Sequence, residues 1–261
     1  MLLSIRNLQK FFGGLKALNG VSLDVEEKTV TGLVGPNGSG KSTLFNVVSG
    51  FLPKEGGEIY FRDEKIDGLT PDEIARRGLV RTFQIDQSAL EITVLQNLLL
   101  AAPHQNGETL WRFIPYFRQI RMEENGNLEK AISILDLVRL KHLANEYAGN
   151  LSGGQRKLLS LGRMLMADPT LYMLDEPTAG VNPTLIKHLL DFLREEVMSK
   201  RGSTIFIIEH NMKVVSNICD KVIVLDSGEK IAEGTPREIQ NNEKVLACYL
   251  ARRRTHDEES N

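Results

Sequence analysis

The sequence predicts an α/β protein with a parallel β-sheet and an inserted helical lobe, and three features indicate this architecture. Two β-rich runs, 170–174 and 203–208, are separated by a predicted helix from about Thr184 to Lys200. This strand–helix–strand order is typical of parallel sheets with right-handed crossovers. The run 29–34 leads into a glycine-rich loop and then into a helical pattern. Between about residues 88 and 165, strand patterns are scarce and helical periodicity dominates.

The first quarter of the chain predicts strands joined by glycine turns. Val21, Leu23 and Val25 alternate with polar residues, which is the period-2 pattern of a half-buried strand. The run 29–34 is short, largely apolar and followed by glycine-rich sequence, as expected of a buried strand that feeds a loop.

Helix boundaries are predicted by local chemistry. Apolar residues keep helical spacing from Leu44 until Gly50, a plausible residue for ending the helix. Thr70 opens a capping box with proline at the first helical position, and Gly78 closes that helix. Thr235 repeats the same capping box near the other end of the chain.

The helical lobe is predicted from two amphipathic patterns. The first has apolar residues at i, i+3, i+4 and i+7, namely Leu128, Ala131, Ile132 and Leu135. The second has the same character and consists of Leu158, Leu161 and Leu165.

Composition excludes several classes of protein. The chain has 261 residues, 41% of them apolar, and a formal net charge of −2. This composition argues against a disordered chain or a disulfide-stapled mini-domain, and it gives no pull toward nucleic acid or anionic lipid. Cys219 and Cys248 have no metal or redox spacing, so we expect two plain thiols in a reducing compartment.

No segment predicts insertion into a membrane. The longest apolar stretches fall far short of the roughly 18–20 residues that a spanning helix needs. The N-terminus lacks the basic and long apolar regions of a signal peptide. We therefore expect a cytosolic protein that reaches a membrane only through a partner.

A phosphate-binding loop is predicted between the strand 29–34 and the following helix. The sequence GPNGSGKS, starting at Gly35, matches the pattern G-x-x-x-x-G-K-[ST]. Glycines let successive backbone N–H groups and the helix N-terminus point at an anion. Lys41 would reach the β- and γ-phosphates, and the Ser42 hydroxyl would bind Mg²⁺. The loop and the helix start give these nucleotide-binding candidates: Gly35, Pro36, Asn37, Gly38, Ser39, Gly40, Lys41, Ser42 and Thr43.

Two carboxylates follow the strand 170–174. Asp175 stands where proteins with this type of loop hold Mg²⁺. Glu176 is placed to accept a proton from an attacking water, as a general base must. Strands also end in Asp or Glu only for solvation, but the phosphate-binding loop favours the functional interpretation.

A second glycine-rich helix start occurs at Leu151-Ser152-Gly153-Gly154-Gln155. A serine with two glycines offers a hydroxyl and backbone N–H groups to an anion. The same residues also make an ordinary N-cap with a flexible turn, and their chemistry alone leaves both interpretations open.

Taken together, these motifs resemble the ATP-binding cassette (ABC) family of ATPases. The resemblance runs from about residue 3 to 251 and includes the loop at Gly35, Gln84 at a strand end, the LSGGQ signature, Asp175-Glu176 and His210 after the next strand. It implies a P-loop NTPase core: a mixed sheet with flanking helices, an N-terminal antiparallel β-region and an inserted α-helical lobe. The implied domains are a core of 1–87 and 166–240, a helical subdomain of 88–165 that carries the signature, and a C-terminal helix and solvated tail of 241–261.

The resemblance also implies roles for single residues. Gln84 looks like the glutamine that touches Mg²⁺ and water, and His210 looks like the switch histidine that contacts the γ-phosphate. Phe12 lies where the family stacks an aromatic ring on adenine. Packing of Phe12 into the first sheet is the rival interpretation, and Phe11 is the alternative residue for stacking. The segment 179–182 occupies the position of the D-loop, at the dimer interface.

The family arrangement implies partners as well. Two nucleotide-binding subunits face head to tail, so that Ser152, Gly153, Gly154 and Gln155 serve the ATP held by the opposite subunit. Transmembrane permease subunits read the opening and closing of this dimer, and a solute-binding protein acts indirectly. The chain would then lie on the cytoplasmic face of the cell membrane.

Looser features resemble the ATPase subunits of branched-chain amino-acid importers. They include GGLKAL from Gly13, RTFQ from Arg81, TVLQN from Thr93, IEHNM from Ile208 and ACYL from Ala247. An aromatic- and arginine-rich insert, about 103–126, is either an amphipathic helix of the lobe or a contact with a partner or membrane surface. The alternatives are the ATPase of a lipid or lipopolysaccharide exporter and a soluble ABC ATPase of DNA repair or translation.

Overall fold

The computed structural model describes residues 1–82, 89–103 and 110–249, with only the backbone described for 110–120 and for position 185. Its described residues form two compact units. The first unit falls within Met1–Arg81, Thr170–Thr178 and Leu190–Asn261, and the second within Thr82–Pro169 and Ala179–Leu189.

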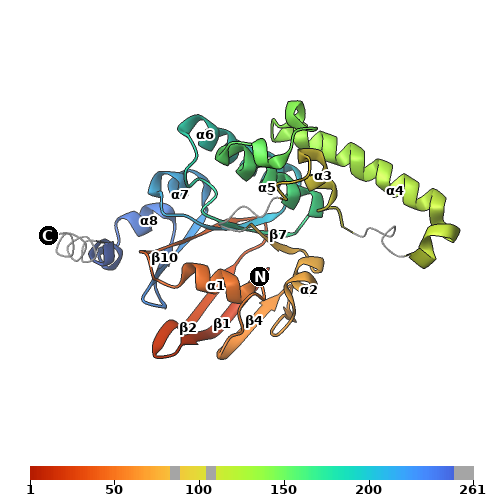
Figure 1. Ribbon diagram of the computed structural model, residues 1–261. Coiled ribbons are helices and arrows are strands. Elements are labelled where there is room, and N and C mark those ends of the chain that lie inside the picture. Colours follow the sequence, from red (N-terminus) through yellow and green to blue (C-terminus); the bar gives the residue numbers. More distant parts are fainter. Residues whose placement is uncertain (83–88, 104–109, 250–261) are drawn as a thin grey trace. The chain divides into compact units, whose positions relative to one another are not determined.

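An antiparallel sheet occupies the N-terminal part of the first unit (Figure 1). Its strand order is β2-β1-β4-β5, and the strands are β1 (Leu3–Phe12), β2 (Leu15–Val25), β4 (Gly56–Phe61) and β5 (Glu64–Lys65). The alternation predicted in β2 is confirmed, because Val21, Leu23 and Val25 are buried.

A second, mixed sheet leads into most of the candidate functional residues of the first unit. Its order is β10-β9-β3-β8-β7-β6. The strands are β3 (Val30–Val34), β6 (Leu79–Arg81), β7 (Leu171–Asp175), β8 (Thr204–Ile208), β9 (Lys221–Asp226) and β10 (Glu229–Gly234). All neighbours pair in parallel except β10, which runs antiparallel to β9. The carboxyl ends of β3, β7 and β8 therefore meet at one edge of this sheet.

Short helices accompany the two sheets. They are α1 (Lys41–Val48), α2 (Pro71–Arg76), α7 (Met212–Ile218) and α8 (Pro236–Gln240), with a further helix at 243–249. Both predicted capping boxes are confirmed at the starts of α2 and α8, and Gly50 and Gly78 follow α1 and α2 with φ of +78° and +96°. The predicted helix from about Thr184 to Lys200 begins as α6 (Pro183–Phe192) and continues as a π-helix, η4 (Leu193–Lys200).

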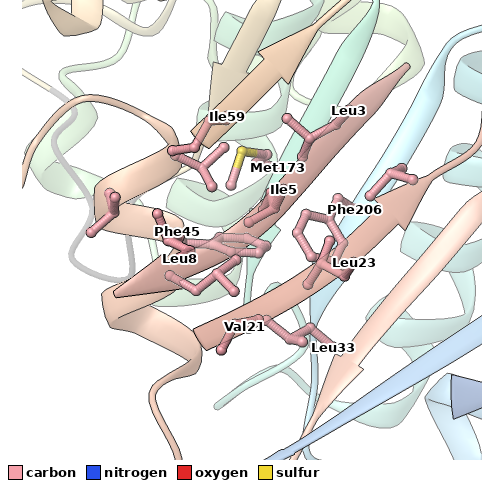
Figure 2. Packing of buried hydrophobic residues seen from close by; sticks show 14 of the residues in the cluster. Leu3, Ile5, Leu8, Val21, Leu23, Leu33, Phe45, Ile59, Met173 and Phe206 are labelled. Atoms are coloured by element: carbon pink, nitrogen blue, oxygen red, sulfur yellow. The ribbon is translucent and has the colours of Figure 1, made fainter. Parts of the chain in front are cut away.

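One hydrophobic core joins both sheets to α1 (Figure 2). Ile5 and Leu8 of β1 and Leu33 of β3 are completely buried in it. Phe45 of α1 lies 4.9 Å from Phe206 of β8, ring centroid to ring centroid, at a tilt of 47°. Burial of such side chains stabilises a fold by about 1.5–3 kcal/mol each, so the core fixes α1, and the loop before it, against the sheet.

The second unit contains three helices that pack on one another. They are α3 (Val94–Leu99), α4 (Leu110–Leu137) and α5 (Gly153–Ala167), with short 3₁₀ turns η2 (Lys141–Leu143) and η3 (Ala148–Asn150). Thr93 caps α3 in a capping box with Gln96. The buried side chain of Asn97 bonds to both backbone groups of Ala89 at 2.9 Å. These contacts give structural roles to Thr93, Gln96 and Asn97 of the TVLQN segment.

The predicted apolar face of α4 is partly wrong. Ala131 and Leu135 are buried, as expected, but Leu128 and Ile132 are 37% and 39% exposed. The buried face instead includes Ile134 and is continued by Val138, just beyond the helix. Ile134 packs closely on Gly162 of α5, where an added Cβ would lie 3.3 Å from Ile134 Cγ2, so packing against α5 selects a face rotated from the predicted one.

Neither cysteine forms a disulfide, and burial raises the pKa of the Cys219 thiol to about 12. Cys219 therefore carries no thiolate near neutral pH. Along the described residues, no helix combines the length and apolar character needed to cross a membrane.

Candidate nucleotide site

The loop after β3 has a backbone that only glycine adopts easily. Gly35, Gly38 and Gly40 have φ of +152°, +75° and +101°. A Cβ on Gly40 would also lie 2.5 Å from the carbonyl oxygen of Ala17, because β2 passes close to the loop. Glycine is therefore required at this position both by backbone conformation and by space.

The side chain of Lys41, the residue that follows the loop, points back toward the start of the loop. Its Nζ donates hydrogen bonds to the carbonyl oxygens of Gly35 and Pro36, both at 2.9 Å, and lies 3.3 Å from Ser39 Oγ. The side chain is buried, whereas Ser42 is exposed at the helix start and Thr43 is half-buried. The ammonium charge is thus held inside the loop by neutral carbonyls, which an incoming phosphate can replace with a stronger ionic partner.

Asp175 ends β7 and forms a buried ion pair with Arg81. Its Oδ2 lies 2.7 Å from Arg81 Nη2, and the side chains are 2% and 6% exposed. Arg81 also donates to Asn46 Oδ1 at 2.6 Å and lies over the ring of Phe45, and both residues belong to α1. Arg81 therefore connects the Asp175 carboxylate to the helix that follows the phosphate-binding loop.

Glu176 and His210 are brought together at the ends of neighbouring parallel strands. Glu176 Oε2 lies 3.8 Å from His210 Nδ1, which is beyond hydrogen-bond length. The backbone of Glu176 is left-handed, with φ of +47°, and its N–H donates to the Ile208 carbonyl at 3.0 Å. An acceptor of protons and an imidazole thus face one another beside the loop-bearing strand β3.

The two candidates for stacking on adenine differ in their exposure to solvent. Phe12 is 46% exposed, with Lys10 Nζ 5.2 Å from its ring centroid. Phe11 is half-buried, and its N–H donates to Glu55 Oε2 at 2.8 Å. Glu55 also pairs with Lys10 at 2.8 Å. The exposed ring of Phe12 is therefore the better placed of the two to receive a base.

The signature residues start helix α5 in the second unit. Ser152 Oγ accepts from the Gln155 N–H at 3.3 Å, and Gln155 Oε1 accepts from the Ser152 N–H at 2.8 Å. This capping box realises the N-cap interpretation of the motif. Gly153 has open space around it, and Gly154 is half-buried. In the D-loop segment, Lys157 Nζ donates to the Ala179 carbonyl.

Gln84 lies outside the described residues. Among the residues that the structure does describe, no group of three or more His, Cys, Asp or Glu is arranged to hold a metal ion. Mg²⁺ in phosphate-transfer sites is held by one or two protein oxygens together with substrate phosphates. The hydroxyl of Ser42 and the carboxylate of Asp175 offer oxygen atoms of the kind that such a site uses.

Four residues that contact this site were given no role from the sequence: Arg81, Thr178, Glu209 and Tyr249. Arg81 pairs with Asp175, and Glu209 binds Thr178 close to Glu176. Burial raises the pKa of Tyr249, and a hydrogen bond with the backbone of Gly35 opposes that rise. Arg81, Glu209 and Tyr249 belong to the segments RTFQ, IEHNM and ACYL, which resemble branched-chain amino-acid importer ATPases. That resemblance was the only feature of the sequence that could have drawn attention to them.

Comparison with known proteins agrees with this geometry. The family described as ABC transporter matches residues 18–179, and a family described as branched-chain amino acid ATP-binding cassette transporter matches residues 229–250. The chain is 44% identical over 249 residues to a probable branched-chain amino acid transport ATP-binding protein LivG of Archaeoglobus fulgidus, covering 95% of each. It is 41% identical to the high-affinity branched-chain amino acid transport ATP-binding protein LivG of Salmonella typhimurium, covering 95% of this chain and 97% of the relative.

Solved structures show the same likeness. The ADP conformation of MJ1267, an ATP-binding cassette of an ABC transporter, matches with a TM-score of 0.80 at 40% identity, covering 95% of this chain and 98% of that one. The dimeric structure of MJ0796, a bacterial ABC transporter cassette, matches with a TM-score of 0.75 at 25% identity, covering 90% and 99%.

Proposed function

Because this chain belongs to the ABC transporter family, we propose that it is the ATP-binding and ATP-hydrolysing subunit that powers import of branched-chain amino acids across the cytoplasmic membrane. The match of residues 229–250 to the branched-chain cassette family supports the substrate class. The single observation that carries the hydrolytic activity is the approach of Glu176 to His210 at the edge where the phosphate-binding loop leaves the sheet.

ATP binds through the loop from Gly35 to Thr43. The backbone N–H groups at the start of α1 receive the phosphates, and Lys41 exchanges its carbonyl partners for phosphate oxygens. Phe12 stacks on adenine. Ser42, Asp175 and Gln84 are the residues that would hold Mg²⁺, which neutralises charge on the phosphates when bound.

Hydrolysis to ADP and phosphate needs a base and a group that orients the γ-phosphate. Glu176 takes a proton from the attacking water, and His210 contacts the γ-phosphate beside it. Arg81 holds the Asp175 carboxylate in one orientation, so that this ligand need not be ordered when nucleotide arrives.

The working unit is a head-to-tail dimer with a second nucleotide-binding subunit, identical or related. Residues 152–155 of one subunit complete the nucleotide site on the loop of the other. Dimeric cassettes among the structural relatives support this arrangement. The dimer acts on transmembrane permease subunits, and through them on a solute-binding protein, from the cytoplasmic face of the membrane.

The proposal is tested by co-expressing the chain with any membrane proteins that its neighbouring genes encode and measuring leucine uptake into vesicles that contain ATP. We expect the complex to co-purify and uptake to require ATP. Co-purification with lipid-transport proteins, or stable binding to DNA or ribosomes without membrane subunits, would assign the chain to one of the alternative classes.

A further inference from the structure

A buried carboxyl group lies directly beside the proposed hydrolytic residues. Glu209 follows β8 and precedes His210, and its side chain is completely buried. Its Oε1 accepts hydrogen bonds from Thr178 N–H at 3.1 Å and from Thr178 Oγ1 at 2.6 Å. Its Oε2 has no hydrogen-bond partner among the described residues. Burial of such a group is unfavourable, which points to a role that an apolar residue could not fill.

The group fastens a strained turn. Glu176 has a left-handed φ of +47° and precedes Pro177, which normally pushes its neighbour toward extended backbone. A non-glycine residue keeps such a conformation only when its surroundings hold it. Two hydrogen bonds to the end of β8 hold this conformation. The Ile208 carbonyl accepts from the Glu176 N–H, and the Glu209 carboxylate accepts from the Thr178 N–H.

We propose that Glu209, through Thr178, is a positioning residue that fastens the turn 176–178 to the end of β8 and so holds the Glu176 carboxylate beside His210. Because Glu209 and His210 are adjacent, the hydrogen bonds between Glu209 and Thr178 fix the position of Glu176 relative to His210. This inference rests on the proposed function, since it assigns a role within ATP hydrolysis.

Substitutions at Thr178 separate the contact from general stability. Thr178→Val removes the hydroxyl donor and keeps the backbone N–H, whereas Thr178→Ser keeps both donors. Thr31→Val is the matched control: Thr31 is a completely buried threonine of β3, and its hydroxyl has no hydrogen-bond partner among the described residues. All three proteins are compared for ATP hydrolysis (kcat and KM), for equilibrium binding of a fluorescent ATP analogue and for Tm.

We expect Thr178→Val to lower kcat by about 10- to 100-fold, since small displacements of catalytic groups have effects of that size. Analogue binding should change less than twofold, and Thr178→Ser should restore most of kcat. Thr31→Val should hydrolyse ATP at the wild-type rate. A second pair at Glu209 makes the same comparison: Glu209→Gln keeps an oxygen acceptor and should retain most activity, whereas Glu209→Leu should not.

The inference is overturned if Thr178→Val keeps the wild-type kcat, or if its kcat falls only in proportion to folded protein at the assay temperature. It is also overturned if Thr178→Ser is as impaired as Thr178→Val. The proposed function fails separately, when the wild-type protein itself neither binds nor hydrolyses ATP.

Discussion

Two glycine-rich helix starts in this chain solve the same problem in different ways. At the start of α1, the N-cap is Gly40 in the left-handed region, and among the described residues no side chain caps the helix. At the start of α5, Ser152 and Gln155 satisfy each other in a capping box. Both helices have backbone N–H groups at their first turn that favour an anion.

The difference indicates when each helix start becomes a binding site. The loop before α1 is shaped by its glycines and by the core around Phe45, so it can accept a phosphate in a single subunit. The start of α5 uses its own side chains, so an anion must compete with an existing cap. In the proposed dimer, the ATP held by the opposite subunit would supply that competition.

Glu176→Gln should have the largest effect on the two helix starts, because it allows ATP to bind but prevents the hydrolysis that would separate them. The amide cannot take a proton from water, so we expect hydrolysis to fall about 10²–10⁴-fold while ATP still binds. ATP should then hold both helix starts together in a stable dimer, detected by size-exclusion chromatography. Turnover at the wild-type rate would contradict the assignment of Glu176 as the base.

Lys41→Ala should disable the α1 site alone. Loss of an ionic partner for the phosphates should weaken ATP binding by about 100-fold, which corresponds to about 2.7 kcal/mol. Binding is measured with a fluorescent ATP analogue, and Lys65→Ala, an exposed lysine of β5, is the matched control. Equal affinities in the two variants would remove the phosphate-binding role from Lys41.

A pair of glycine substitutions tests the backbone difference directly. Gly40→Ala places a Cβ against Ala17 at a left-handed φ, so we expect a loss of about 2–3 kcal/mol in the free energy of unfolding. Gly153→Ala meets nothing within 4 Å and should leave stability within about 1 kcal/mol of the wild type. Urea denaturation measures both, and equal destabilisation would show that the two glycines are required for the same reason.

Ser152→Asp and Ser152→Asn should have the smallest effects, and they differ only in charge. Both residues cap helices about as well as serine, so Tm should stay close to the wild type. In the Glu176→Gln background, Asp should weaken the ATP-dependent dimer about tenfold by repulsion from phosphate, whereas Asn should not. Ser152→Ala would instead lose about 1 kcal/mol through the missing cap.

Local patterns predicted much of the fold correctly. The alternation in β2, the capping boxes of α2 and α8 and the glycine ends of α1 and α2 depend on neighbours in the chain, and all are confirmed. The face of α4 depends on which helices pack against it, and that prediction was half wrong. The helical subdomain was predicted to span 88–165. The second unit of the structure falls within Thr82–Pro169 and also includes Ala179–Leu189.

The family resemblance drawn from the motifs is confirmed, as is the mixed sheet with an antiparallel N-terminal region and a helical part. The phosphate-binding loop could be predicted because the spacing of its residues is fixed along one segment, and the roles of its residues stay a prediction. Sequence reasoning missed the partners Arg81 and Glu209, whose contacts lie 94 and 31 residues away along the chain.

The sequence by itself determined four of the strands and several helix starts, together with the chemistry offered at each, because turns, caps and periodicity act over a few residues. The tertiary structure alone decided which of those groups meet. Parallel pairing of β7 with β8 placed Glu176 beside His210, and it let the buried Glu209, just after β8, accept a hydrogen bond from Thr178 in the turn after β7. Such contacts depend on sheet order and burial, which no short stretch of sequence specifies.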